Sequence, residues 1–138
     1  MTNTTITGVA HLGIRVLELE RSRAFYEKLD FTFVIGPIGS EPVAIMRHAS
    51  GLEINFVLNA DKNVDANILQ DVPEKHPGYT HVALGVADLE AAMAHLKEVG
   101  IPIKSGPVTY PGGAQGIFVR DPDFNTIELY QHAPQSEK

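Results

Sequence analysis

The chain has 138 residues, of which 43% are hydrophobic and 20% charged, as expected for one soluble domain or two fused half-sized units. The net charge of −6 argues against nucleic acid or an anionic membrane as the main partner. Cysteine is absent, which excludes disulfides, thiolate metal sites and cysteine nucleophiles. No signal peptide or membrane-spanning apolar run is visible in the sequence, so we expect a cytoplasmic protein.

The first half of the chain predicts a strand, a helix and three further strands. Leu12, Ile14 and Val16 alternate with small or polar residues, which is the periodicity of a strand. Apolar residues spaced between charges then predict a helix within 17–29. The following strands are expected at 31–36, 42–48 and 51–58, with a hairpin turn at 47–51.

A polar stretch at 59–78 is interpreted as a linker, with a short helical turn at 66–69. The second half then repeats the order of elements. A strand begins near Tyr79, and a helix runs from its predicted N-cap Asp88 to a stop at Gly100. The last strands are expected at 102–105, 116–120 and 125–132, with a hairpin turn at 120–125.

An internal repeat organises the chain. The segment that begins at His11 resembles the segment that begins at His81, seventy residues later. Each half ends in an acid flanked by aliphatic residues, Glu53 in the first half and Glu128 in the second. These acids do not keep the spacing of seventy, so we expect five extra residues in the second half, within 111–116.

Strand alternation places the histidines and acids opposite the aliphatic faces that pack on helices. Glu53 shares its face with Asn55 and Val57, and Glu128 shares its face with Tyr130 and His132. An acid on the inner face of an apolar strand is costly unless it is paired or binds a cation. Two imidazoles and two carboxylates are a plausible ligand set for a divalent metal.

Four segments carry a resemblance to the vicinal oxygen chelate superfamily, which includes glyoxalase I, bleomycin-resistance proteins, fosfomycin-resistance transferases, epimerases and extradiol dioxygenases. They are residues 11–16, 22–26, 81–86 and 121–129. The resemblance implies an α+β fold in which paired βαβββ modules form an incomplete barrel. The chain is then a single domain over 1–138, with modules at 7–58 and 79–132 joined by the linker at 59–78.

Within this superfamily the chain is most similar to the small bacterial glyoxalase I, a lactoylglutathione lyase. That likeness implies one divalent ion, nickel, cobalt or zinc, bound by His11, Glu53, His81 and Glu128. It implies a lyase or isomerase that moves a proton through a metal-stabilised enediolate, as in converting a hemithioacetal to a thioester. Glu128 is then the principal base and Glu53 lies opposite it.

Other interpretations stay open at this point. Three ligands, His11, His81 and Glu128, match the fosfomycin-resistance and extradiol branches. An epimerase, or a member that only binds a small molecule such as an antibiotic, is a further alternative. Arg15, Asn55 and Tyr130 share the faces of the proposed ligands and are candidates for binding a small-molecule substrate. The resemblance implies a homodimer, in which one partner supplies His11 and Glu53 and the other supplies His81 and Glu128.

Overall fold

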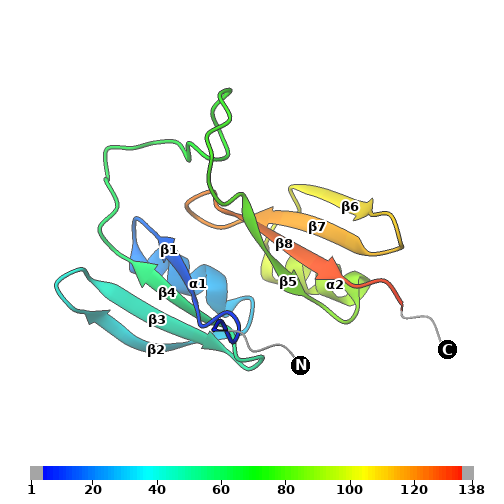
Figure 1. Cartoon of the computed structure of the whole chain (residues 1–138), viewed down its shortest axis with the longest axis horizontal. Helices are drawn as coiled ribbons and strands as arrows, with labels where there is room; N and C mark the ends of the chain where they lie inside the picture. Colours follow the sequence, from blue (N-terminus) through cyan, green and yellow to red (C-terminus); the bar gives the residue numbers. More distant parts are fainter. Residues whose placement is uncertain (1–4, 135–138) are drawn as a thin grey trace. The chain divides into compact units, whose positions relative to one another are not determined.

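The computed structural model describes residues 5–134, which divide between Asn63 and Val64 into two compact units. Each unit has the strand–helix–strand–strand–strand order that the sequence predicts (Figure 1). The first unit contains β1 (Leu12–Arg15), α1 (Leu19–Glu27), β2 (Phe31–Ile38), β3 (Val43–His48) and β4 (Glu53–Val57). The second contains β5 (His81–Gly85), α2 (Leu89–Val99), β6 (Ser105–Thr109), β7 (Gln115–Arg120) and β8 (Thr126–Gln131).

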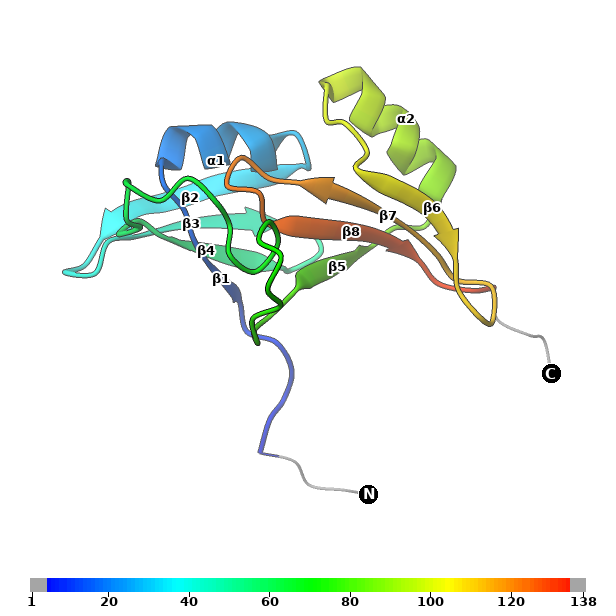
Figure 2. The ribbon, with the colours of Figure 1, turned by 90° about the horizontal axis from the view of Figure 1, so that it is seen from above.

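Each unit has one open, four-stranded mixed sheet. The strand orders are β1-β4-β3-β2 and β5-β8-β7-β6, with one parallel pair at the start and antiparallel pairs beyond it. Figure 2 shows α1 along one face of the first sheet and α2 along one face of the second. The α+β prediction is confirmed, and neither sheet closes into a barrel. The sixth strand is the poorest prediction, because it runs over 105–109 instead of 102–105.

The cores lie between each helix and its own sheet, as the alternation of apolar residues predicts. In the first unit, Tyr26 packs against the rings of Phe25, Phe31 and Phe56, with centroids 5.0–5.8 Å apart. In the second unit, the aliphatic side chains of β7 and β8 are buried. They are Ile117, Val119, Ile127 and Leu129.

The ends of α2 follow the predicted capping residues. Asp88 accepts a hydrogen bond from the backbone N–H of Ala91 at 3.2 Å, and Gly100 ends the helix with a φ of 81°. Neither helix in the described part of the chain has the length and apolar character needed to cross a bilayer.

The pairing of the strands shows how the two halves correspond. Ile38 and Val108 occupy matching places in β2 and β6, and they pair with Val43 and Gly116. Val108 lies 70 residues after Ile38, whereas Gly116 lies 73 residues after Val43. The β6–β7 loop therefore holds three more residues than the β2–β3 loop. The place of the predicted insertion is confirmed, but its predicted length of five residues is wrong. The error arose from matching the two acids with each other.

The stretch predicted as a linker is divided between the units. Residues up to Asn63 belong to the first unit, and residues from Val64 onward belong to the second. Around Asn67 the chain forms a hydrogen-bonded turn, in which the N–H groups of Gln70 and Asp71 donate to the Asn67 carbonyl at 3.0 and 2.7 Å. This turn lies near the position of the helical turn expected at 66–69.

Candidate functional site

In the second unit, a histidine and a carboxylate stand beside each other. His81 begins β5, and Glu128 lies in the middle of β8, which pairs with β5 in parallel. The His81 Nε2 lies 3.1 Å from the Glu128 Oε1. The Glu128 side chain is only 6% exposed, whereas that of His81 is 36% exposed. The pair therefore presents an imidazole nitrogen and a buried carboxylate oxygen at one place on the sheet.

The other oxygen of this carboxylate is held by a tyrosine. The Tyr110 hydroxyl donates a hydrogen bond of 2.6 Å to the Glu128 Oε2. This hydrogen bond is the main cause that raises the pKa of Tyr110 above its ordinary value, with desolvation and the charge of Glu128 adding to it. Tyr110 therefore stays a protonated donor at neutral pH, and Glu128 retains a fixed orientation.

A glycine makes room for the carboxylate. Gly116 in β7 is buried, and a Cβ atom at this position would overlap the Glu128 Oε2. Since β7 runs antiparallel beside β8, only a residue without a side chain leaves this space above the sheet. The sheet thus contains a recess shaped for the buried carboxylate.

Aromatic rings surround this group. The Phe118 ring contacts the His81 imidazole edge-on, with centroids 5.6 Å apart. Tyr130 stacks on Tyr110 at 5.9 Å and also contacts the ring of His132. The predicted substrate-binding residue Tyr130 therefore lies beside the tyrosine that holds Glu128.

The first unit treats its acid differently. Glu53 forms an ion pair with the neighbouring Arg47 at 2.8 Å, and its side chain is 24% exposed. His11 lies immediately before β1 and is exposed. The four predicted ligands are therefore divided as two pairs between the units, and only the second pair is in hydrogen-bond contact within its unit.

Strand register identifies a different residue as the counterpart of Glu128. Glu128 pairs with Ala83 and Phe118, and the matching positions of the first unit, Gly13 and Ile45, pair with Asn55. Asn55 thus corresponds to Glu128. By the same register, Glu53 corresponds to Thr126, because Glu53 pairs with Arg47 of β3 and Thr126 pairs with Arg120 of β7.

The amide of Asn55 has an orphaned oxygen. Its Oδ1 is buried and has no hydrogen-bond partner among the described residues. A buried carbonyl oxygen without a donor costs free energy, and such a group calls for an explanation such as a bound ion. Asn55 is therefore a second oxygen ligand candidate in the first unit, beside Glu53.

Arg15, the predicted substrate-binding cation, has local polar contacts. Its Nε donates to the Asn59 Oδ1 at 2.9 Å, and its guanidinium lies 3.7 Å from the Glu41 carboxylate. Both members of this ion pair are more than half exposed, so the pair contributes little to stability and leaves Arg15 accessible to a ligand.

Whether this protein can bind a metal ion depends on which donor atoms its side chains bring together. Within residues 5–134, no three side chains of histidine, cysteine, aspartate or glutamate gather closely enough to hold one. The donors nevertheless suit a cation in their chemistry, because the His81 nitrogen faces a buried carboxylate oxygen and the Asn55 oxygen has no donor. Each unit thus presents donor atoms of a kind that a divalent ion accepts.

Sequence reasoning missed three members of the second-unit group. Tyr110 and Gly116 flank the loop with the additional residues, and Thr80 contacts the His81 Nδ1 through its hydroxyl at 2.9 Å. The insertion itself was the available signal for Tyr110, because an addition in one copy of a repeat often carries a function. Nothing in the sequence pattern marks the partnership of Gly116 with Glu128.

Comparisons with known proteins agree on one group. Residues 8–129 match the model of the Glyoxalase/Bleomycin resistance protein/Dioxygenase superfamily. A probable lactoylglutathione lyase of Vibrio cholerae serotype O1 is 30% identical over 136 residues, covering 90% of each chain. A glyoxalase family protein from Enterococcus faecalis has a TM-score of 0.75 at 23% identity, covering 92% of this chain and 99% of its own.

A genomically encoded fosfomycin resistance protein from Listeria monocytogenes has the same fold. Its TM-score is 0.68 at 18% identity, and the match covers 94% of this chain and 96% of that protein. Similarities at this identity concern the fold alone, and proteins with this fold differ in what they do.

Proposed function

Because this chain belongs to the Glyoxalase/Bleomycin resistance protein/Dioxygenase superfamily, we propose that it is a metal-dependent lyase or isomerase of the glyoxalase I type. Its substrate is a small molecule with adjacent oxygen atoms, such as a hemithioacetal of an α-ketoaldehyde. The name of the Vibrio cholerae relative supports the lyase part of the proposal. We also propose that the protein works as a homodimer, which sedimentation at micromolar concentration tests.

One observation carries the proposal: the buried Glu128 carboxylate lies between the His81 imidazole and the Tyr110 hydroxyl, at 3.1 and 2.6 Å. A purely structural carboxylate in an apolar strand would be a costly choice. Here the sheet opens a space for it at Gly116 and orients it with a phenol. A buried carboxylate that is given space and a fixed orientation in this way is typical of a metal ligand or a general base.

The residues that would hold the metal are His81 and Glu128, joined by His11 and by an oxygen donor of β4. A divalent cation bound there would act as a Lewis acid, which stabilises negative charge on the oxygens of a chelating substrate. The donor from β4 is either Glu53, as the resemblance implies, or Asn55. The register and the orphaned Oδ1 favour Asn55, whereas Glu53 is neutralised by Arg47.

The protein's own contribution is to hold and move a proton at Glu128. The Oε1 faces the His81 Nε2, so this oxygen lies on the side of the proposed metal. The Oε2 accepts the hydrogen bond from Tyr110, which keeps the carboxylate in one orientation. Glu128 thus accepts a proton from the substrate carbon and returns it to the neighbouring carbon.

A second candidate function follows from Asn55. If β4 supplies no carboxylate, the histidine and carboxylate ligands are only His11, His81 and Glu128, with the neutral Asn55 oxygen at most beside them, and this matches the three-ligand branches of the superfamily. A fosfomycin-modifying transferase or an extradiol dioxygenase then becomes the better description. Carbonyl oxygens also favour manganese or magnesium over zinc, so the identity of the metal helps to separate the two candidates.

The test combines metal analysis with a substrate panel. The dialysed protein is reconstituted with nickel, cobalt, zinc or manganese and is assayed with methylglyoxal plus glutathione or other thiols. Metal-dependent hemithioacetal turnover supports the first candidate. Oxygen uptake with catechols, or thiol addition to fosfomycin, supports the second. A protein that binds no metal and turns over none of these substrates would contradict both.

A further inference from the structure

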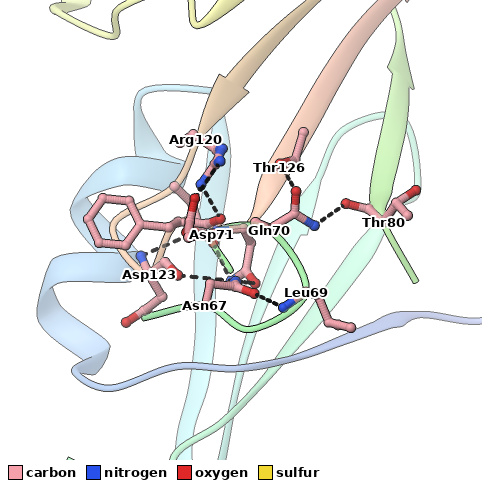
Figure 3. Close-up of polar contacts among 11 residues, drawn as sticks. Asn67, Leu69, Gln70, Asp71, Thr80, Arg120, Asp123 and Thr126 are labelled. Atoms are coloured by element: carbon pink, nitrogen blue, oxygen red, sulfur yellow. Dashed lines mark hydrogen bonds and ion pairs between the residues drawn. The ribbon is translucent and has the colours of Figure 1, made fainter. Parts of the chain in front are cut away.

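A turn outside the candidate site reaches the strand that carries His81. Residues 67–71, here the 67–71 turn, precede β5 in the chain and contact the ends of β5, β7 and β8 (Figure 3). The first unit has no sequence counterpart for these contacts, because the turn belongs to the stretch between the two repeats. Three polar side chains of the turn, those of Asn67, Gln70 and Asp71, make these contacts as hydrogen bonds of 2.7–3.0 Å.

Two side chains attach the turn to the β7–β8 connection. The Asn67 amide donates to the Asn125 Oδ1 at 3.0 Å, and Asp71 accepts from both terminal nitrogens of Arg120 at 2.9 and 3.3 Å. The Arg120 hydrogen bond is the main cause that lowers the pKa of Asp71, so the carboxylate stays charged at neutral pH. The Asn67 Oδ1 also accepts from the N–H of Leu69 at 3.1 Å, which fixes the turn itself.

Gln70, between these anchors, joins the two strands of the candidate site. Its Nε2 donates to the Thr80 carbonyl at 2.7 Å, and its Oε1 accepts from the Thr126 hydroxyl at 2.7 Å. Thr126 is the register partner of His81. One half-buried amide therefore connects the residue before His81 with the residue opposite it.

Thr80, which Gln70 holds by its carbonyl, also contacts the His81 imidazole through its hydroxyl. Its Oγ1 lies 2.9 Å from the His81 Nδ1, while the His81 Nε2 faces Glu128. A histidine that binds a metal through Nε2 carries its proton on Nδ1 and donates it to a neighbouring acceptor. The Thr80 hydroxyl is in the right place to be that acceptor.

His11, the counterpart of His81 in the first unit, lacks these neighbours. Ala10 stands where the repeat would place the counterpart of Thr80, and it has no hydroxyl. Glu53 stands at the position of Thr126 and is bound to Arg47. The two histidines of the repeat thus have different neighbours, and only His81 has a side-chain acceptor in the preceding residue.

We propose that Gln70 is a positioning residue that fixes Thr80 and thereby holds His81 in the tautomer and orientation that present its Nε2 beside Glu128. The inference rests on the proposed function, in which His81 binds the metal. It adds the 67–71 turn to the site as the part that orients this histidine.

The main experiment reads the tautomer of His81 in the metal-free protein. Two-bond ¹H–¹⁵N spectra of the imidazoles are recorded above the ordinary histidine pKa of about 6.5, with His81 assigned by its loss in His81→Gln. Because the Glu128 carboxylate is an acceptor, the metal-free wild type is expected to show one tautomer with the proton on Nε2, while the Thr80 hydroxyl donates to Nδ1. Gln70→Ala and Thr80→Val are expected to give a mixture, and Thr80→Ser is expected to restore the wild-type signal.

A second measurement uses Co²⁺ alone as the probe. Removing a partner of a metal-binding histidine commonly lowers metal affinity by about 10–100-fold, and this loss is expected for Gln70→Ala and Thr80→Val. Gln115→Ala is the matched control, because it removes a glutamine of the same unit whose side chain contacts Thr109 outside this network. Gln70→Glu is the second variant in case Gln70→Ala does not fold, since it retains an acceptor for Thr126 but no donor for Thr80.

The outcomes separate the two proposals. A wild-type tautomer of His81 in a folded Gln70→Ala or Gln70→Glu protein would overturn the positioning role. A mixed tautomer in these variants supports that role even if the wild type binds no Co²⁺, a result that would reject the proposed metal function alone. Unchanged Co²⁺ affinity in Gln70→Ala, with metal binding by the wild type, would also overturn the inference.

Discussion

The two units share a topology but differ in how they treat the acid of their last strand. In the second unit Glu128 is buried, oriented by Tyr110 and adjacent to His81. In the first unit the corresponding residue is Asn55, and Glu53 lies two residues earlier, paired with Arg47. The comparison teaches that a repeated His…Glu pattern in a sequence need not be a repeat of positions in the fold, because three additional residues change which residues match.

Glu128→Gln tests whether the buried acid of the second unit is the general base, and it has the largest expected effect. Glutamine keeps the shape and one oxygen but cannot accept a proton at neutral pH. We expect turnover of the identified substrate to fall by about 10²–10⁴-fold, the usual contribution of a positioned general base. Solvent-deuterium exchange of the substrate α-proton is the direct measurement. Exchange at the wild-type rate would show that Glu128 is not the base.

Gly116→Ala is expected to disturb the same carboxylate by steric means. The new methyl group would occupy the place of the Glu128 Oε2, so the carboxylate or the strand must shift. Overpacking of this kind usually costs about 1–3 kcal/mol of stability, which urea unfolding measures. The Glu128→Ala, Gly116→Ala double variant is the control, because without the carboxylate the methyl group should cost much less.

Asn55→Ala and Glu53→Gln decide between the two oxygen donors of the first unit. If Asn55 is the donor, its removal should lower the affinity for Co²⁺ by about tenfold or more, whereas Glu53→Gln should change it by less than about twofold. The reverse order would restore Glu53 as the ligand and the closer likeness to glyoxalase I. Isothermal titration of both metal-free variants against the wild type gives the answer.

Asp71→Asn should have the smallest effect, and that effect should depend on pH. The folded-state pKa of Asp71 lies below its ordinary value of 3.8, so the ion pair with Arg120 stabilises the protein above this value and is lost as the pH falls through the folded-state pKa. Because both partners are partly exposed, we expect at most about 1 kcal/mol at neutral pH. Urea unfolding should show this difference at pH 7 and a smaller one in acid. A constant difference would contradict the charge-based explanation.

Much of the fold could be predicted from the sequence, because local patterns determine it. The alternation in β1, the capping of α2 by Asp88 and Gly100, and the turn residues at 120–125 all have direct structural counterparts. Register could not be predicted in the same way. It depends on the length of a loop, and two acids with similar neighbours suggested a false correspondence between Glu53 and Glu128.

The candidate site was predicted in part for the same reason. Strand phase placed Glu128 and Tyr130 on one face, and the structure brings His81 to the same carboxylate. The insertion draws attention to Tyr110, but the contacts of Tyr110 with Glu128 and of Gln70 with Thr80 join segments without a shared periodicity, so the sequence does not indicate these partners. Whether His11 and the β4 oxygen complete a metal centre with this group stays a prediction.

The three additional residues of the β6–β7 loop also bear on how such a protein can evolve. When a binding centre is built from identical copies of one small module, every insertion appears in all copies at once. Fusion of two copies into one chain removes that constraint, because each half can then change alone. Here the second half has the longer loop, which bears Tyr110, and the first half has the shorter connection. The two halves of this chain thereby present different side chains at matching positions, which identical modules cannot do.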